Sequence, residues 1–249
     1  MPDLFKKHRR RKLAETPVPA GWRPLLERDA PFFGELSPEQ QEQLLAGLQV
    51  FLAEQSFVGA GGLELTEEMK VVIGATAVRL VLGLSLDEYE RLTEIVVYPF
   101  QALQDPTEDR ALLGVAHRHG AVVLCWPAVL EGLRRPHDGH DTAAHEFAHA
   151  LDLADGVFDG APSLRAAEHY RPWAQVLGAA FAKLEDGDPG LASVMRMYGA
   201  TDPPEFFAVA TESFFERPTA LQQRAPRLYA ELSRFYGQDP AARGPAAVL

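Results

Sequence analysis

The chain has 249 residues, of which 47% are hydrophobic and 24% charged, a composition that indicates a soluble globular protein with a substantial core. No apolar run approaches the ~20 residues of a membrane-spanning helix, so no membrane span is expected. The net charge of −11 argues against a nucleic-acid-binding protein, because phosphate contacts require a basic surface. The single cysteine, Cys125, excludes an intrachain disulfide and favours a cytoplasmic location.

The N-terminus is basic although the whole chain is acidic. Residues 6–12 contain six lysines and arginines, and no apolar stretch follows them, so the segment does not have the form of a secretory signal. We expect residues 1–20 to be a flexible basic tail and residues 21–249 to form a single domain.

Two helices are predicted in the first third of the chain. Ser37 can cap the first, which runs to Leu52 and has Gln40 at the capping-box position. Thr66 can cap the second, over residues 67–84, which is apolar enough to be largely buried.

Two short strands follow, EIVVYP at 94–99 and AVVLCWP at 121–127, and a proline ends each of them. A bend at 114–120 and a loop at 134–141 flank the second strand. That strand directly precedes the most informative part of the chain, and its edge could bind an extended peptide.

Helices dominate the second half. Asp141 or Thr142 can cap the helix that contains HEFAHALD, and Gly156 ends it. Another helix follows around Trp173, and a last helical region spans 204–236 with breaks near its prolines. Helices with a small sheet beside the HEFAHALD helix predict a mostly helical α+β fold.

HEFAHALD, residues 145–152, places two histidines one helical turn apart on one face. The rings of His145 and His149 can both reach a zinc ion at about 2.0–2.1 Å, and Glu146 between them can act as a general base. H-E-x-x-H on a helix is typical of zinc metalloproteases. The alternative is a helix whose histidines bond solvent or backbone, but the apolar neighbours of these rings predict that they are buried and need partners.

A catalytic zinc site requires a third protein ligand and one open position. Glu205 and Glu212 are seven residues apart on a predicted apolar helix, and spacing alone does not choose between them. Glu205 could instead complete a capping box with Asp202, and Glu212 could lie at an exposed helix end.

The two helical motifs resemble the Mlc titration factor A family of bacterial zinc peptidases. The matching stretches are HEFAHALD, YGATDPPEFFAVATESFF at 198–215 and FVGAGGLELTEEMK at 57–70, and the resemblance covers most of residues 35–240. The second stretch also resembles the catalytic domain of anthrax lethal factor, in which a tyrosine precedes a ligand glutamate by seven residues.

The resemblance implies a zincin-like fold with one Zn²⁺ per chain, held by His145, His149 and Glu205. It implies Glu146 as the general base and Tyr198 as a hydroxyl that stabilises the oxyanion, a role that fits a phenol beside a metal. The alternative for Tyr198 is a packing residue before a turn. Glu212 and Asp152 then become candidates for orienting the ligand imidazoles.

Other reactive residues are not assigned to the site. Four histidines lie in predicted loops, and their spacing matches no metal pattern: His117, His119, His137 and His140. Cys125 is expected to be a small core residue rather than a nucleophile.

We therefore predict a cytoplasmic, aminopeptidase-like zinc peptidase that acts on peptides or small aminoacyl substrates. The alternative is a regulatory protein that captures a transcription repressor of sugar uptake, a property that the family resemblance implies, with the peptidase activity secondary. A purely structural zinc site is disfavoured, because no fourth Cys or His stands at motif spacing.

Overall fold

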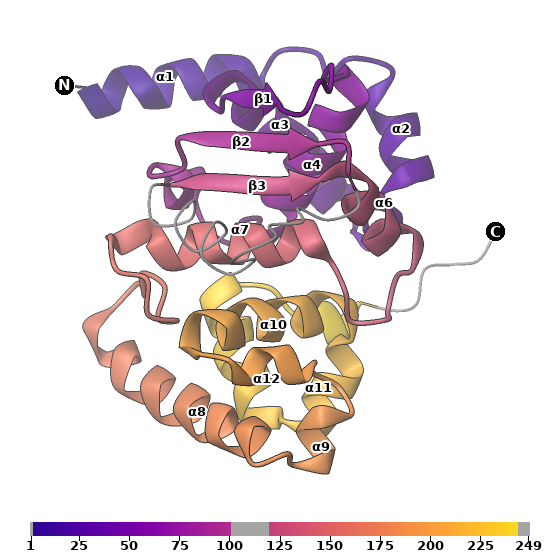
Figure 1. The fold of residues 1–249 in the computed structure, drawn as a ribbon. Coiled ribbons are helices and arrows are strands. Elements are labelled where there is room, and N and C mark those ends of the chain that lie inside the picture. The colour runs from indigo at the N-terminus through magenta and orange to yellow at the C-terminus, as the bar shows by residue number, and fades with distance from the viewer. Residues whose placement is uncertain (1, 101–119, 244–249) are drawn as a thin grey trace.

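The computed structural model describes residues 2–100 and 120–243, and a small parallel sheet lies among helices in it (Figure 1). The strands are β1 (Phe57–Gly59), β2 (Glu94–Tyr98) and β3 (Ala121–Cys125), in the order β1-β2-β3. The two predicted strands are confirmed, whereas β1 falls in a glycine-rich segment that the sequence did not identify as a strand.

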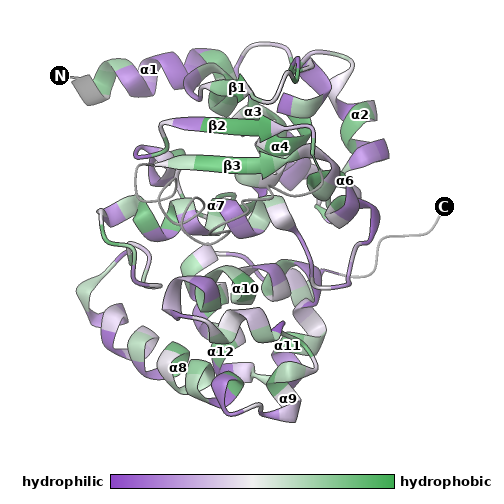
Figure 2. Ribbon diagram, viewed as in Figure 1, coloured by the Kyte–Doolittle hydropathy of each residue, from purple (hydrophilic) through white to green (hydrophobic). Residues whose placement is uncertain are grey.

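Alternate side chains of β2 and β3 are buried, as the two-residue period of a strand requires. The register pairs Ile95 with Val122 and Val97 with Leu124, so these buried side chains lie side by side across the two strands. Figure 2 shows both strands as hydrophobic over most of their length, in contrast to the mostly hydrophilic first helix.

Four helices come from the first third of the chain: α1 (Pro2–Ala14), α2 (Trp22–Asp29), α3 (Pro38–Glu54) and α4 (Glu67–Leu80). Ser37 forms the predicted capping box with Gln40 at the start of α3, and Thr66 caps α4 by accepting a hydrogen bond from the Met69 amide. Both predicted helices are confirmed, and α4 ends four residues before its predicted end at Leu84.

Within the segment expected to be a flexible tail, the structure describes α1 as a helix that packs against α3. Two basic residues one turn apart hold it there. Arg10 bonds Glu54 of α3 at 2.8 Å, and Lys6 lies 2.6 Å from Asp87. The basic run therefore pairs with acidic groups of the body, which is a contact that its own sequence does not reveal.

Seven helices are described after the sheet: α6 (Trp126–Arg134), α7 (Thr142–Asp152), α8 (Ala167–Glu185), α9 (Pro189–Ala192), α10 (Pro203–Glu216), α11 (Pro218–Arg224) and α12 (Pro226–Tyr236). Pro218 and Pro226 open α11 and α12 at the predicted breaks, since proline suits the first helical turn. Pro127 likewise lies in the first turn of α6, a helix that the sequence did not predict.

Short 3-10 turns connect these elements: η1 (Pro31–Glu35), η2 (Leu86–Tyr89), η3 (Leu153–Asp155), η4 (Met197–Ala200) and η5 (Pro240–Ala242). Gly156 follows η3 in a left-handed conformation, φ 93°, and ends the α7–η3 segment as predicted.

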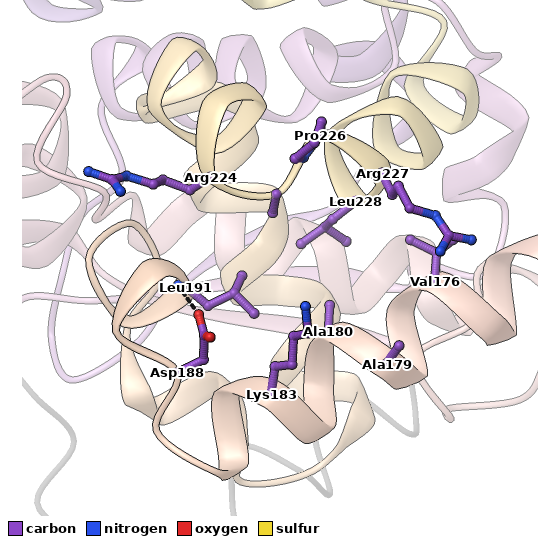
Figure 3. Close-up of a pocket in the computed structure, with 11 residues that line it drawn as sticks. Val176, Ala179, Ala180, Lys183, Asp188, Leu191, Arg224, Pro226, Arg227 and Leu228 are labelled. Atoms are coloured by element: carbon purple, nitrogen blue, oxygen red, sulfur yellow. Dashed lines mark hydrogen bonds between the residues drawn. The ribbon is translucent and has the colours of Figure 1, made fainter.

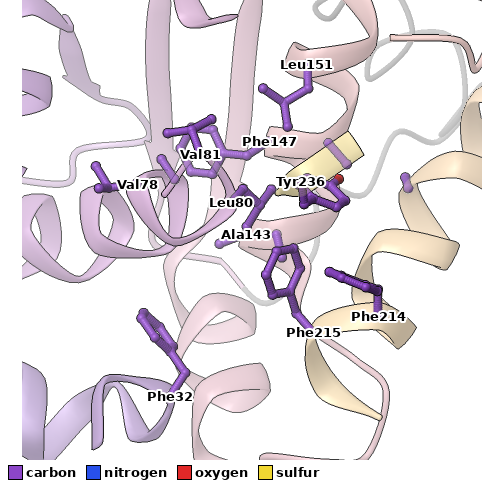
Figure 4. Packing of buried hydrophobic residues seen from close by; sticks show 14 of the residues in the cluster. Phe32, Val78, Leu80, Val81, Ala143, Phe147, Leu151, Phe214, Phe215 and Tyr236 are labelled. Atoms are coloured by element: carbon purple, nitrogen blue, oxygen red, sulfur yellow. The ribbon is translucent and has the colours of Figure 1, made fainter. Parts of the chain in front are cut away.

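The helix α7 is central in the packing. It contacts β3 and α4 on one side and α10 on another, and Figure 1 shows it between the sheet and the C-terminal helices. Figure 4 shows Phe147 and Leu151 of α7 near Leu80 of α4, with Phe215 of α10 and Tyr236 of α12 close by. A buried α7 holds its histidines on a rigid support.

The described residues thus form the mostly helical α+β arrangement that the sequence predicts, with the sheet beside α7. Within the ranges 2–100 and 120–243, no helix is long and apolar enough to cross a membrane.

Candidate metal centre

Two buried imidazoles project from α7. Asp141 caps this helix by accepting a hydrogen bond from the Ala144 amide at 2.9 Å, so it starts one turn before the first histidine. The His145 and His149 rings are edge to face with centroids 4.8 Å apart. This is the arrangement that the i, i+4 spacing predicts.

The carboxylate of Glu205 approaches both rings from α10. Its Oε2 lies 3.1 Å from Nε2 of His145 and 3.5 Å from Nε2 of His149. The ligand atoms of the three residues lie within 4.8 Å of one another. Ligands of a tetrahedral zinc at about 2.0–2.1 Å are separated by about 3.3 Å, which the two distances from Glu205 to the imidazoles match.

The hydrogen bonding of Glu205 also fits a metal ligand. Its Oε2 is buried and, among the described residues, has no polar partner apart from the two imidazole nitrogens, so it faces the position between the rings that a metal ion would take. Its other oxygen, Oε1, accepts a hydrogen bond from the Tyr198 hydroxyl at 3.0 Å. Asp202 caps α10 through the Glu205 amide, while the Glu205 side chain faces the imidazoles, so the capping-box alternative does not describe this carboxylate.

Glu212 lies on the other side of the His145 ring. It is 1% exposed, which excludes the alternative of a solvated helix end. Its Oε1 accepts a hydrogen bond from His145 Nδ1 at 2.7 Å and its Oε2 accepts one from the Asp141 amide at 2.9 Å. A proton on Nδ1 leaves the lone pair of Nε2 directed at the Glu205 side, which is the tautomer that a metal ligand needs.

The charges of this cluster favour a cation at its centre. Burial by itself lowers the pKa of His145, but the carboxylates of Glu212, Glu205 and Glu146 outweigh it and raise the pKa to about 10. Burial raises the pKa of Glu205, but His145 and His149 outweigh it and hold the pKa well below its usual range. Three carboxylates around two imidazoles therefore attract positive charge, which a metal ion can supply.

Glu146 and Asp152 are also buried on α7. Glu146 is 7% exposed and close enough to His145 to affect its pKa. Asp152 accepts a hydrogen bond from the Gly160 amide at 2.9 Å, and burial raises its pKa to about 7. The proposed action of Asp152 on an imidazole stays a prediction.

A buried arginine on α4 joins this centre to the N-terminal helices, although the sequence pattern gave no signal for it. Arg79 lies 3.2 Å from Glu216 Oε1 and 3.6 Å from Asp141 Oδ2, and it bonds the Phe215 carbonyl at 2.9 Å. Its guanidinium also lies over the Phe32 ring, 4.4 Å from the centroid. An apolar helical pattern hides such a residue, because only the packed structure shows what faces it.

The other candidate residues stay outside the centre. His137 contacts Glu216 and Glu35, and the His140 amide bonds Asp138. Cys125 is half-buried in β3 rather than in the core. His117 and His119 lie outside the described residues.

A separate cavity of about 290 Å³ lies among α8, α9, α11 and α12 (Figure 3). Leu191 and Leu228 contribute to its apolar lining, and Lys183 and Arg227 border it. It shares no residue with the cluster on α7 and α10, so the two features are distinct.

Comparison with known proteins identifies a metallopeptidase family. The sequence profile of the glucose-regulated metallo-peptidase M90 family matches residues 4–237. An uncharacterized protein, slr2042, of Synechocystis sp. is 37% identical over 244 residues, which cover 93% of this chain and 89% of that protein.

Proteins named Mlc titration factor A are also similar. The one from Serratia proteamaculans is 32% identical over 229 residues, with 86% of each chain covered. The one from Cronobacter sakazakii is 30% identical over 230 residues, covering 86% of this chain and 84% of that protein. The chain thus belongs to the glucose-regulated metallo-peptidase M90 family, and it is related to the Mlc titration factor A proteins.

Proposed function

We propose that this protein is a zinc-dependent peptidase of the aminopeptidase type, with a zincin-like site and one Zn²⁺ held by His145, His149 and Glu205. The observation that carries the proposal is the position of Glu205 Oε2, which is buried, lies within 3.5 Å of both Nε2 atoms and has no other polar partner in the part of the chain that the structure describes. Two imidazoles and one carboxylate form a typical catalytic zinc ligand set.

When bound, zinc would polarise the scissile carbonyl and lower the pKa of the attacking water. Glu146 is assigned the proton transfer: its carboxylate takes a proton from that water and delivers it to the leaving amine. The position of Glu146 supports this role, because it is 7% exposed and directly follows His145 on α7.

Tyr198 is assigned the stabilisation of the oxyanion. Its side chain is 38% exposed, and its hydroxyl already bonds Glu205, so it lies at the solvent side of the cluster where a substrate carbonyl must enter. A phenol there can donate a hydrogen bond to the oxygen on which negative charge develops.

Zinc content and hydrolysis of leucine p-nitroanilide test the proposal. We expect about one zinc per chain in the wild type, hydrolysis that a chelator abolishes, and a Glu146→Gln variant that keeps zinc but does not hydrolyse the substrate. Glu168→Gln, an exposed change on α8, is the matched control and should leave both values unchanged. Wild-type protein that binds no zinc, or Glu146→Gln protein that still hydrolyses the anilide, would contradict it.

A second candidate function is the capture of a transcription repressor, which the name of the relatives suggests, because it describes titration of Mlc. We propose that such binding would use a surface away from the metal centre. Capture of purified Mlc should then be equal for the wild type and Glu146→Gln. Loss of capture in that variant would indicate a substrate-like encounter instead.

A further inference from the structure

Arg196 is a permanent cation beside the candidate metal centre that the proposed chemistry does not use. It immediately precedes η4 and donates a hydrogen bond to Glu212 Oε1, the oxygen that also accepts from His145 Nδ1. Its guanidinium carbon lies 5.8 Å from the centre of the Tyr198 ring, and that ring lies 6.0 Å from the His145 ring. Arg196 therefore lies next to the residue assigned to the oxyanion.

The guanidinium has hydrogen-bonding capacity to spare. It carries five N–H donors, and among the described residues Glu212 is the acceptor that it uses. Its Nη2 donates to Glu212 and its Nε is buried without a partner, whereas Nη1 makes no hydrogen bond to the described residues and the side chain as a whole is 30% exposed. A planar fork of this kind binds carboxylates in two-point geometry.

Arg196 differs from the other partners of the two acids in its charge. Of the ion pairs that Glu205 and Glu212 make with described residues, only the one from Arg196 carries a permanent positive charge, because the others involve histidines. The carboxylates of Glu205 and Glu212 would repel the carboxylate of a substrate, whereas the guanidinium of Arg196 would attract it.

We propose that Arg196 is a specificity-determining residue that binds the free C-terminal carboxylate of short peptides, so that dipeptides and tripeptides are the preferred substrate class. This inference rests on the proposed peptidase function. One residue of extended chain spans about 3.3–3.6 Å, so a carboxylate one or two residues from the scissile bond can reach a group next to Tyr198. The restraint by Glu212 holds the guanidinium in place and lowers the entropy cost of binding.

The test compares Leu-Leu and Leu-Leu-amide, which differ in the C-terminal carboxylate. For the zinc-loaded wild type we expect kcat/KM to be about tenfold higher for Leu-Leu, the size of one hydrogen bond to a charged group. Arg196→Gln should bring this ratio close to one, and Arg196→Lys should keep part of it. The ratio is taken on one protein, so any general loss of activity from the weaker contact with Glu212 cancels.

Lys183→Gln is the matched control, since it removes the same charge at the separate cavity and should keep the wild-type ratio. Calorimetric binding of both peptides to metal-free protein gives a second readout, in which Leu-Leu should bind more tightly and the preference should vanish in Arg196→Gln. A wild-type ratio near one, or a preference that survives in Arg196→Gln, would overturn the inference while leaving the peptidase proposal intact. Absence of hydrolysis of both peptides would contradict the peptidase proposal itself, and the inference with it.

Discussion

Glu212 accepts a hydrogen bond from Nδ1 of His145 at 2.7 Å, although 67 residues separate the two in the chain. The contact links α10 to α7 and defines which nitrogen of His145 faces Glu205. Two acids on one helix thus meet the two nitrogens of one ring, Glu212 at Nδ1 and Glu205 at Nε2.

The different positions of the two acids predict different effects on zinc binding. Glu212→Gln should weaken zinc affinity by about 10–100-fold, as loss of a residue that orients a ligand does. Glu205→Ala should weaken it more, because it removes a proposed ligand. Competition with a chromophoric chelator measures both, with exposed Glu185→Gln as the control. A larger loss of zinc affinity in Glu212→Gln than in Glu205→Ala would show that Glu205 is not the ligand.

The hydroxyl of Tyr198 is predicted to act on the transition state more than on substrate binding. Tyr198→Phe should retain zinc and lower kcat by about 10²–10³-fold with a small change in KM, the usual effect of removing one oxyanion donor. Steady-state kinetics with an aminoacyl anilide, together with the zinc content, measure this. An unchanged kcat would remove the Tyr198 hydroxyl from the mechanism.

Arg79 is predicted to matter for stability. Arg79→Met should lower the free energy of unfolding by about 3–5 kcal/mol, because it leaves the buried carboxylates of Asp141 and Glu216 without their cation. Urea denaturation of metal-free protein measures this loss. Arg135→Met is the control, since Arg135 pairs with Glu131 at the surface and such pairs contribute at most about 1 kcal/mol. Equal losses for the two variants would show that the Arg79 contacts are not a stabilising network.

Asp152 provides a pH-dependent prediction. Burial raises its pKa from 3.8 to about 7, so the fold favours the protonated acid, and the stability that this group contributes below pH 3.8 is lost as the pH rises to about 7. The asparagine of Asp152→Asn cannot ionise. The free energy of unfolding of this variant should therefore increase relative to that of the wild type over this pH range, by at most about 1.4 kcal/mol per unit of the pKa shift.

Thermal unfolding of metal-free Asp152→Asn and wild type at pH 5 and pH 8 measures the difference. The exposed aspartate Asp186 is a suitable control position, and Asp186→Asn should show no such trend. A relative stability that does not rise with pH would mean that Asp152 is ionised without cost in the folded protein.

Local patterns were sufficient for much of the fold. The capping box at Ser37, the cap at Thr66 and the breaks at Pro218 and Pro226 were predicted because each depends on hydrogen bonds or steric restrictions within a few residues. The N-terminal basic run was not, because α1 is held by acidic residues that lie far along the chain.

In the candidate site, too, some features depend on local sequence and others on contacts between distant residues. The sequence by itself determined that His145 and His149 share one face of a helix, since a spacing of four residues sets this within a single turn. Spacing left Glu205 and Glu212 equivalent, the family resemblance favoured Glu205 as the ligand, and neither gave a signal for Arg196 or Arg79. Only the tertiary structure showed what each of these four residues contacts, because the packing of α10 against α7 places one acid at Nε2 and the other at Nδ1, and brings each arginine to the carboxylate that it neutralises.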